Sequence, residues 1–193
     1  MTFEEEIYFS RNHEWKSINL DKPLELVAKF DDRVRTIYLD QASILLNNEN
    51  SFYNSFSAGV ILFSAIEWVG SFLTKHNGFK NKLDEFLKYS KDYTALELDE
   101  REQLSKKITE CFRNGIIHNG RVKDACQFDY NFDEKLFASK ENFLIVNTKP
   151  LHDLVVTVLN HYIEILNKDE LILQQFLDRF KNEFDVELKK LVS

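Results

Sequence analysis

Glycine and proline are scarce in this chain, whose 193 residues include 5 and 2 of them, respectively. These residues form most tight turns, and an all-β protein needs many turns, so a protein built mainly of sheet is disfavoured. Leucine, lysine and glutamate are abundant and favour helices. Because 44% of the residues are hydrophobic, the chain can bury a sizeable core. We therefore expect an all-α fold in a single domain over residues 1–193.

Cysteine is also scarce, with only Cys111 and Cys126 in the chain. Two cysteines are too few for a disulfide framework or for a zinc site of four cysteine ligands. Both are predicted to be small buried residues, and a disulfide between them is the less favoured alternative. The sequence also lacks a glycine-rich phosphate loop, a Gly-x-Ser-x-Gly turn and a Cys/His cluster. Nucleotide hydrolysis, serine hydrolysis and structural zinc are therefore disfavoured.

The first six residues contain three glutamates and no apolar run, which excludes a secretory signal peptide. A cytoplasmic protein is expected. Residues 52–75 are apolar nearly all round, but Glu67 lies in their middle and Ser57, Ser64 and Ser71 recur every seven residues. A membrane-spanning helix rarely carries an ionisable residue at such a place, so no membrane association is expected.

Charge is unevenly distributed along the chain, whose net charge is -7. Such a balance disfavours non-specific attraction to nucleic acid, since phosphate affinity comes mainly from lysine and arginine. Residues 101–123 nevertheless carry six basic and two acidic side chains, which makes this segment about +4 and the remainder about -11. The total charge therefore conceals a local basic segment.

Apolar residues recur at spacings of three and four in several segments, which is typical of amphipathic helices. They predict helices over residues 23–46, 52–75, 79–89, 98–118, 150–165 and 169–191. The helix over residues 52–75 is expected to be central and covered on several sides, with its serines forming a seam where a neighbouring helix could approach. Asn119 and Gly120 form the expected left-handed cap after residue 118. Residues 1–20 are ambiguous, and a short helix there is left open.

Residues 124–147 break the helical pattern. Cys126, Phe128, Tyr130 and Phe132 alternate with polar residues, and residues 143–146 form a second β-prone run. Alternation with a period of two is typical of a strand that is buried on one face. The segment therefore predicts a small β-hairpin with a polar tip of ten residues, inserted after the helix over residues 98–118.

The end of that helix contains Arg113, Asn114 and His118 within six positions. At ~100° per residue, an apolar stripe faces the core and Arg113 lies on the opposite side, about 140° from His118. The stripe consists of Leu104, Ile108, Cys111, Phe112 and Gly115. Arginine and histidine can then meet in two ways, either by unwinding of the helix near Gly115 or across a dimer. Ile117 beside Arg113 on the outward face favours a homodimer.

These residue types suit the cleavage of RNA by its own 2′-hydroxyl. That reaction needs a base for the hydroxyl proton, an acid for the leaving 5′-oxygen, and positive charge on the phosphorane. Histidine, with an ordinary pKa near ~6.5, can transfer both protons near neutral pH. Arginine stays protonated and offers a planar fork of donors that fits two phosphate oxygens. Asparagine adds a neutral hydrogen bond, so no metal or cofactor is required.

The segment Arg113-Asn114-Gly115-Ile116-Ile117-His118 resembles the Arg-x4-6-His signature, in its Arg-Asn-x3-His form, of the HEPN superfamily of nucleotide-binding domains. Members of that superfamily are antiparallel bundles of four or five helices, with the motif near the end of a late helix and often a polar residue in an earlier core helix. Glu67 is similar to that polar residue. The resemblance covers about residues 23–166, since the hairpin and the last helix lie outside the family's core.

The resemblance implies a metal-independent endoribonuclease, a toxin or an antiphage defence effector, whose active site is composed across a homodimer. Arg113 and His118 would be the catalytic pair, and Asn114 would orient or support them. The partners would be RNA, a second copy, and an antitoxin or another protein of a defence system. The candidate RNA contacts in the basic segment are Lys106, Arg121 and Lys123.

Three alternatives stay open at this point. The chain can be a non-catalytic HEPN-like module that binds a nucleotide or a protein, or a plain helical interaction protein. In the third alternative, His118 is only a cation that interacts favourably with the negative end of the helix dipole, and Arg113 is only a surface residue. Glu67 is expected to be hydrogen-bonded in each case, to a serine or, of most interest, to Arg113 or Asn114, because an unpaired buried carboxylate is costly.

Overall fold

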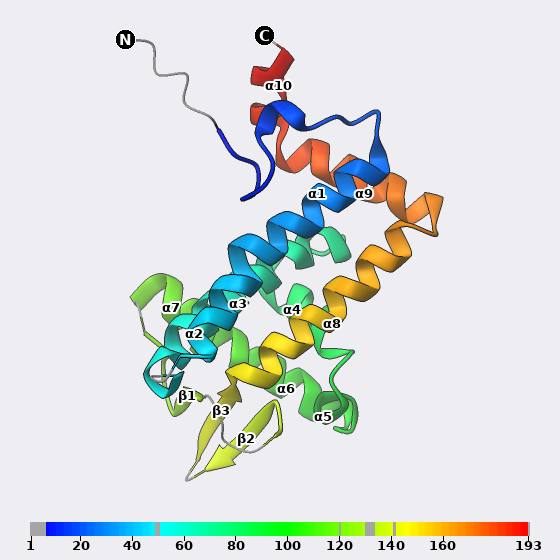
Figure 1. The fold of residues 1–193 in the computed structure, drawn as a ribbon. Coiled ribbons are helices and arrows are strands. Elements are labelled where there is room, and N and C mark those ends of the chain that lie inside the picture. Colours follow the sequence, from blue (N-terminus) through cyan, green and yellow to red (C-terminus); the bar gives the residue numbers. More distant parts are fainter. Residues whose placement is uncertain (1–6, 49–50, 120, 130–133, 141, 193) are drawn as a thin grey trace. The chain divides into compact units, whose positions relative to one another are not determined.

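The computed structural model describes residues 7–48, 51–119, 121–129, 134–140 and 142–192 (Figure 1). They divide into two compact units, residues 1–37 with 159–193, and residues 38–158. Each unit is described by itself below, and the single domain stays a prediction.

The described residues are predominantly helical, as the composition predicts, and also form a small sheet. The helices are α1 (Pro23–Val34), α2 (Asp40–Leu46), α3 (Ser51–Leu73), α4 (Phe79–Leu87), α5 (Lys91–Thr94), α6 (Leu98–Ile108), α7 (Asn114–Asn119), α8 (Thr148–Leu166), α9 (Glu170–Glu183) and α10 (Asp185–Val192). The strands are β1 (Cys126–Asp129), β2 (Phe137–Lys140) and β3 (Phe143–Asn147). A 3₁₀ turn, Trp15–Ser17, is the only helical element of the described part of residues 1–20.

Three predicted helices are interrupted. A π-helical segment, Arg35–Leu39, separates α1 from α2, and a second one, Thr109–Arg113, separates α6 from α7. The last helix breaks at Phe184 between α9 and α10. Apolar residues at spacings of three and four recur on both sides of a π segment, so the wider turn between them leaves little trace in the sequence.

The unit formed by residues 1–37 and 159–193 has an aromatic core. Phe9, Phe176 and Phe180 are fully buried, and the ring centroids of Phe9 and Phe180 lie 5.7 Å apart. Trp15 packs edge-on against Phe9 at 5.0 Å, so the N-terminal segment belongs to this core. Asp32 of α1 secures the same segment, since its carboxylate accepts hydrogen bonds from Ser10 Oγ at 2.5 Å and from Asn12 Nδ2 at 2.7 Å.

The unit formed by residues 38–158 is built around α3, as predicted. Leu62, Ala65 and Ile66 are fully buried, and α2, α4 and β1 pack against this helix. The crossing of α3 and α4 is close, because a Cβ atom on Gly70 would lie 2.5 Å from Cβ of Lys82.

One side of α3 stays open. Ser57 and Ser64 are exposed, so none of the described helices covers the predicted serine seam at these two positions. The Ser64 hydroxyl donates instead to the Val60 carbonyl of the same helix, at 2.9 Å.

The stretch Asn54–Leu73 of α3 is the one helical segment in the described part of the chain that is long and apolar enough to cross a membrane. Half of it is buried inside the fold, and core helices commonly pass the same test. The stretch is therefore weak support for a membrane span.

The predicted hairpin pairs the runs that form β1 and β3, and these strands do pair, but their antiparallel direction is wrong. The strand order is β1-β3-β2, and β1 lies parallel to β3, with Cys126 opposite Leu144. The hairpin is formed instead by β2 and β3, which pair antiparallel from Phe137 and Val146 onward. The predicted polar tip contains β2, whose short sequence Phe-Ala-Ser-Lys has no apolar alternation. Asn142 supplies a positive φ of 71° in the tight turn before β3.

Cys111 and Cys126 are both buried and both free, so the prediction of small buried residues is confirmed. Burial, followed by a hydrogen bond to Cys111, raises the pKa of the Cys126 thiol to about 12. A thiol reacts as the thiolate, so this environment protects Cys126 from alkylation and oxidation.

We expect both thiols to be inert toward a disulfide reagent such as Ellman's at pH 8 in the folded protein. At that pH, a pKa of about 12 leaves only roughly one Cys126 in ten thousand as the thiolate. In guanidinium, both thiols should react within minutes, as measured by the absorbance of the released thiolate. Rapid labelling of Cys126 in the native protein would contradict the buried environment.

Candidate functional site

The motif helix consists of α6, the π segment and α7. Its start is capped by a reciprocal pair in which the side chains of Glu97 and Glu100 accept hydrogen bonds from each other's backbone. Ile108, Cys111, Phe112 and Gly115 are buried, and Leu104 is partly exposed. The predicted apolar stripe is therefore confirmed in its four last positions, and it holds the segment that carries Arg113 against the core.

Gly115 has a different role from the predicted one. The helix does not unwind there, since Gly115 lies within α7 and the departure from α-helical geometry comes before it, at Thr109–Arg113. A Cβ atom on Gly115 would lie 2.6 Å from the carbonyl oxygen of Arg121 and 3.0 Å from the amide nitrogen of Lys123. Lys123 N donates to Cys111 O at 2.9 Å. Gly115 therefore permits the chain after α7 to return against the motif helix.

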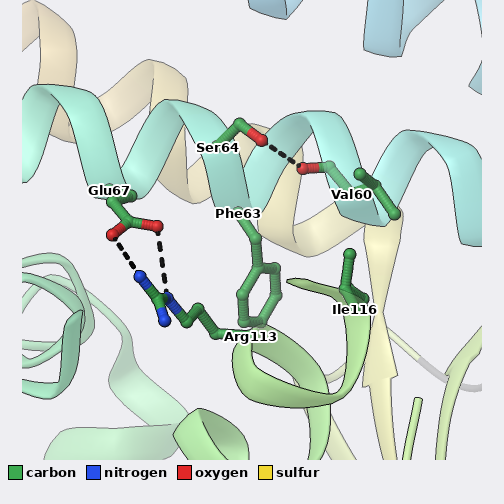
Figure 2. Close-up of a pocket in the computed structure, with 6 residues that line it drawn as sticks. All are labelled: Val60, Phe63, Ser64, Glu67, Arg113 and Ile116. Atoms are coloured by element: carbon green, nitrogen blue, oxygen red, sulfur yellow. Dashed lines mark hydrogen bonds and ion pairs between the residues drawn. The ribbon is translucent and has the colours of Figure 1, made fainter. Parts of the chain in front are cut away.

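Arg113 and Glu67 form a two-bonded ion pair between the motif helix and α3 (Figure 2). Arg113 Nη2 lies 2.9 Å from Glu67 Oε1, and Arg113 Nε lies 3.4 Å from Glu67 Oε2. Arg113 Nη1 donates to Asn114 Oδ1 at 3.3 Å. The expected hydrogen bonding of Glu67 with the motif arginine is thus confirmed, with Arg113 as the donor.

The predicted outward orientation of Arg113 is wrong. Its side chain reaches α3 and is only 27% exposed, and that of Glu67 is 32% exposed. Arg113 is the last residue of the π segment. Because each residue of a π segment turns less about the axis than an α-helical residue, a wheel drawn at a constant angle misplaces the residues that follow.

The ion pair borders a small recess on the surface of this unit (Figure 2). Its lining residues are Val60, Phe63, Ser64 and Glu67 of α3, together with Arg113 and Ile116 of the motif helix. The recess holds about 30 Å³, which is space for about one or two water molecules. A nucleobase does not fit inside it, whereas one oxygen-bearing group can lie at its mouth.

The floor of the recess is formed by Phe63, whose ring belongs to an aromatic cluster. The Phe63 ring lies 5.5 Å from Phe79, 5.8 Å from Phe112 and 5.5 Å from Phe128, measured between centroids. Phe112 and Phe128 are themselves 4.6 Å apart. Four packed rings from four elements therefore hold α3 and the π segment together beside the ion pair.

The candidate site residues are brought together only in part. Arg113, Asn114 and Glu67 are in contact, whereas the backbone of His118 lies on α7 and its side chain is outside the described residues. The same limit applies to Ile117. The three candidate RNA contacts do not line the recess: Lys106 and Arg121 are exposed, and Lys123 is half-buried.

Sequence reasoning singled out Glu67 and Ser64 of the α3 wall but missed Val60 and Phe63, and with them the recess itself. Val60, Ser64 and Glu67 follow one another at spacings of four and three, which places them on one helix face. That spacing is the signal that could have identified the wall. It was hidden because α3 is apolar nearly all round, so its partly open face resembles its buried ones.

Among the described residues, no group of three or more histidine, cysteine, aspartate or glutamate side chains is arranged to hold a metal ion. No protein-family model matches the sequence, and no match is found among curated proteins or solved structures. A function is therefore inferred from the residues of this chain. What they provide is a guanidinium held in one orientation at the edge of a small, mostly apolar recess.

Replacing Glu67 by alanine should destabilise the protein by about 1 kcal/mol, because Arg113 loses both hydrogen bonds to the carboxylate. The effect is limited because both side chains are about a third exposed. Urea unfolding measures it. The matched control is Glu85→Ala, which removes the ion-pair partner of the exposed Lys88 three residues away. This loss should lower the free energy of unfolding by at most about 0.5 kcal/mol. Equal midpoints for the two variants would contradict a structural role for the contact between Glu67 and Arg113.

Proposed function

We propose that this protein is a metal-independent endoribonuclease of the HEPN type that acts in the cytoplasm as a toxin or an antiphage effector. The observation that supports this most is the two-bonded contact of Glu67 with Arg113. It orients the arginine of the Arg-Asn-x3-His segment from an earlier helix, as the resemblance implies. A guanidinium with a fixed orientation can bind a phosphate without first being ordered.

In the proposed reaction, His118 removes the proton of the 2′-hydroxyl and returns a proton to the leaving 5′-oxygen. Arg113 binds the non-bridging oxygens and stabilises the charge of the phosphorane. Asn114 already accepts a hydrogen bond from Arg113 Nη1, and this bond helps to keep the guanidinium in its orientation. The products are a 2′,3′-cyclic phosphate and a free 5′-hydroxyl. Contacts to the RNA backbone come from Lys106, Arg121 and Lys123.

A second copy of the chain completes the site in this proposal. The exposed serines of α3 and the recess share one side of that helix, since Ser64 belongs to both. Pairing of two such faces around a two-fold axis would bring His118 of one copy toward Arg113 of the other. An antitoxin or another protein of a defence system would cover the same side when the activity is off.

A non-catalytic module that binds a nucleotide or a protein is the competing proposal. Its support is that Glu67 already neutralises the guanidinium and that the recess is small. A module of this kind would bind RNA or nucleotides without cleaving them.

Purified protein should cleave labelled RNA in the presence of EDTA, and Arg113→Ala and His118→Ala should each lower the rate by roughly 100-fold or more. The matched controls are Arg11→Ala and His76→Ala, both exposed and outside the recess, which should cleave like the unaltered protein. End-group analysis should find the cyclic phosphate. Cleavage that requires magnesium, or that survives the loss of either motif residue, would overturn the assignment.

Sedimentation should show a dimer at micromolar concentration. Mixing the inactive Arg113→Ala and His118→Ala proteins should restore about a quarter of the activity, because about half of the dimers would be mixed and each would hold one intact site. A monomer, or a mixture that stays inactive although subunits exchange, would mean that each site lies within a single chain.

A further inference from the structure

We infer that the free edge of strand β2 pairs with the same edge of a second copy of the chain, so that two small sheets join into one. β2 (Phe137–Lys140) is an outer strand of the sheet, whose order is β1-β3-β2 (Figure 1). An outer strand leaves backbone N–H and C=O groups unpaired on one side, and these groups can pair with a further strand. No residue of β2 lines the recess beside Arg113, so the inference is independent of the proposed function.

The register of the hairpin shows which backbone groups of β2 point outward. Asn147 N donates to Leu136 O at 3.0 Å, so these two residues form a hydrogen-bonded pair at the start of the hairpin. Hydrogen-bonded and non-hydrogen-bonded positions alternate along an antiparallel pair. Every second residue from Leu136 onward therefore turns its backbone groups toward β3, whereas Phe137 and Ser139 turn theirs to the free edge.

The free edge of β2 is accessible, unlike that of β1. Among the described elements, only β3 packs extensively against β2. Two residues of β2 are exposed and the other two are half-exposed. On β1, Cys126 and Phe128 are the outward positions, because Leu144 N donates to Ala125 O at 2.8 Å, and both of these outward residues are buried. In the described part of the chain, β2 is therefore the edge to which a strand can be added.

A second copy fits this edge in one register. When two β2 strands pair antiparallel about a two-fold axis at Ala138, Phe137 of each copy lies opposite Ser139 of the other. These residues exchange hydrogen bonds through their N–H and C=O groups, so every outward group of both strands gains a partner. A shift of two residues is the smallest that keeps the same groups at the interface. It leaves one outward residue of each strand unpaired within β2, so the symmetric register is favoured.

The side chains of β2 suit that register. At the axis, Ala138 faces Ala138 of the second copy, in a position where Cα atoms approach to about 4.5 Å, and its small side chain permits this approach. Lysine commonly protects sheet edges from pairing. Here Lys140 would lie opposite Leu136 of the second copy, which keeps the two Lys140 residues roughly 14 Å apart along the strands. Repulsion between like charges therefore does not prevent the pairing.

A disulfide can trap this contact, which is expected to be weak because the edge is short. Purified Ala138→Cys protein should form a covalent dimer with oxidised glutathione, which accepts the two electrons and becomes two glutathione molecules. The expected Cα separation of about 4.5 Å suits a disulfide, whereas the separation of roughly 14 Å for Lys140→Cys does not. On non-reducing gels, the Ala138→Cys dimer should form at least roughly tenfold faster than the Lys140→Cys dimer. Unaltered protein should stay uncrosslinked, because its two cysteines are buried.

Ser139→Pro tests the backbone bonds, because proline removes an outward N–H and leaves the ladder to β3 intact. Added to Ala138→Cys, it should slow cross-linking by roughly tenfold, with an unchanged circular dichroism spectrum. Equal rates at positions 138 and 140, or a rate at position 138 that a folded Ser139→Pro variant leaves unchanged, would overturn the inference. Absence of any cross-link would also overturn it, and would leave the edge of β2 to a strand of another protein. No RNA enters these measurements, so their outcome does not bear on the proposed ribonuclease.

Discussion

The contact between Glu67 and Arg113 joins residues 46 positions apart, and the candidate site depends on it. Around it, α3 and the motif helix meet through aromatic rings, which fix distance but not the direction of a long polar side chain. Half-exposed ion pairs contribute little to folding free energy, so the main effect of this one is on orientation. The carboxylate of Glu67 occupies one edge of the guanidinium and so holds the side chain of Arg113 in one orientation.

The sequence predicted the helical content and the buried stripe because both follow from local periodicity. It also predicted a partner for Glu67, because a carboxylate within an apolar helix needs one. The face of Arg113 could not be predicted, since the π segment before it changes the angle between residues without changing the apolar pattern. The direction of the pair β1–β3 was mispredicted for another reason. The strand β2 is short and polar, so it was not recognised, and alternation identifies a strand but not its direction relative to its neighbour.

The recess illustrates how a site can be hidden inside a core pattern. Val60, Phe63 and Ser64 have the composition of a packed helix, and only the open side of α3 gives them another role. The same aromatic rings that fill the core of this unit support the floor of the recess. A substitution at Phe63 would therefore affect both the packing of the core and the shape of the recess.

The return of the chain onto Gly115 bears on which part of the chain near the motif can change in length. The backbone bond from Lys123 to Cys111 closes a loop whose base is held independently of its tip. Residues could be added to or removed from that tip without displacing β1, which begins at Cys126 just beyond the closure. Arg113 and the backbone of His118 both lie on the helical side of this loop, before its tip. A change of length at the tip would therefore leave the five-residue step between the arginine and the histidine as it is, because the helix alone sets that step.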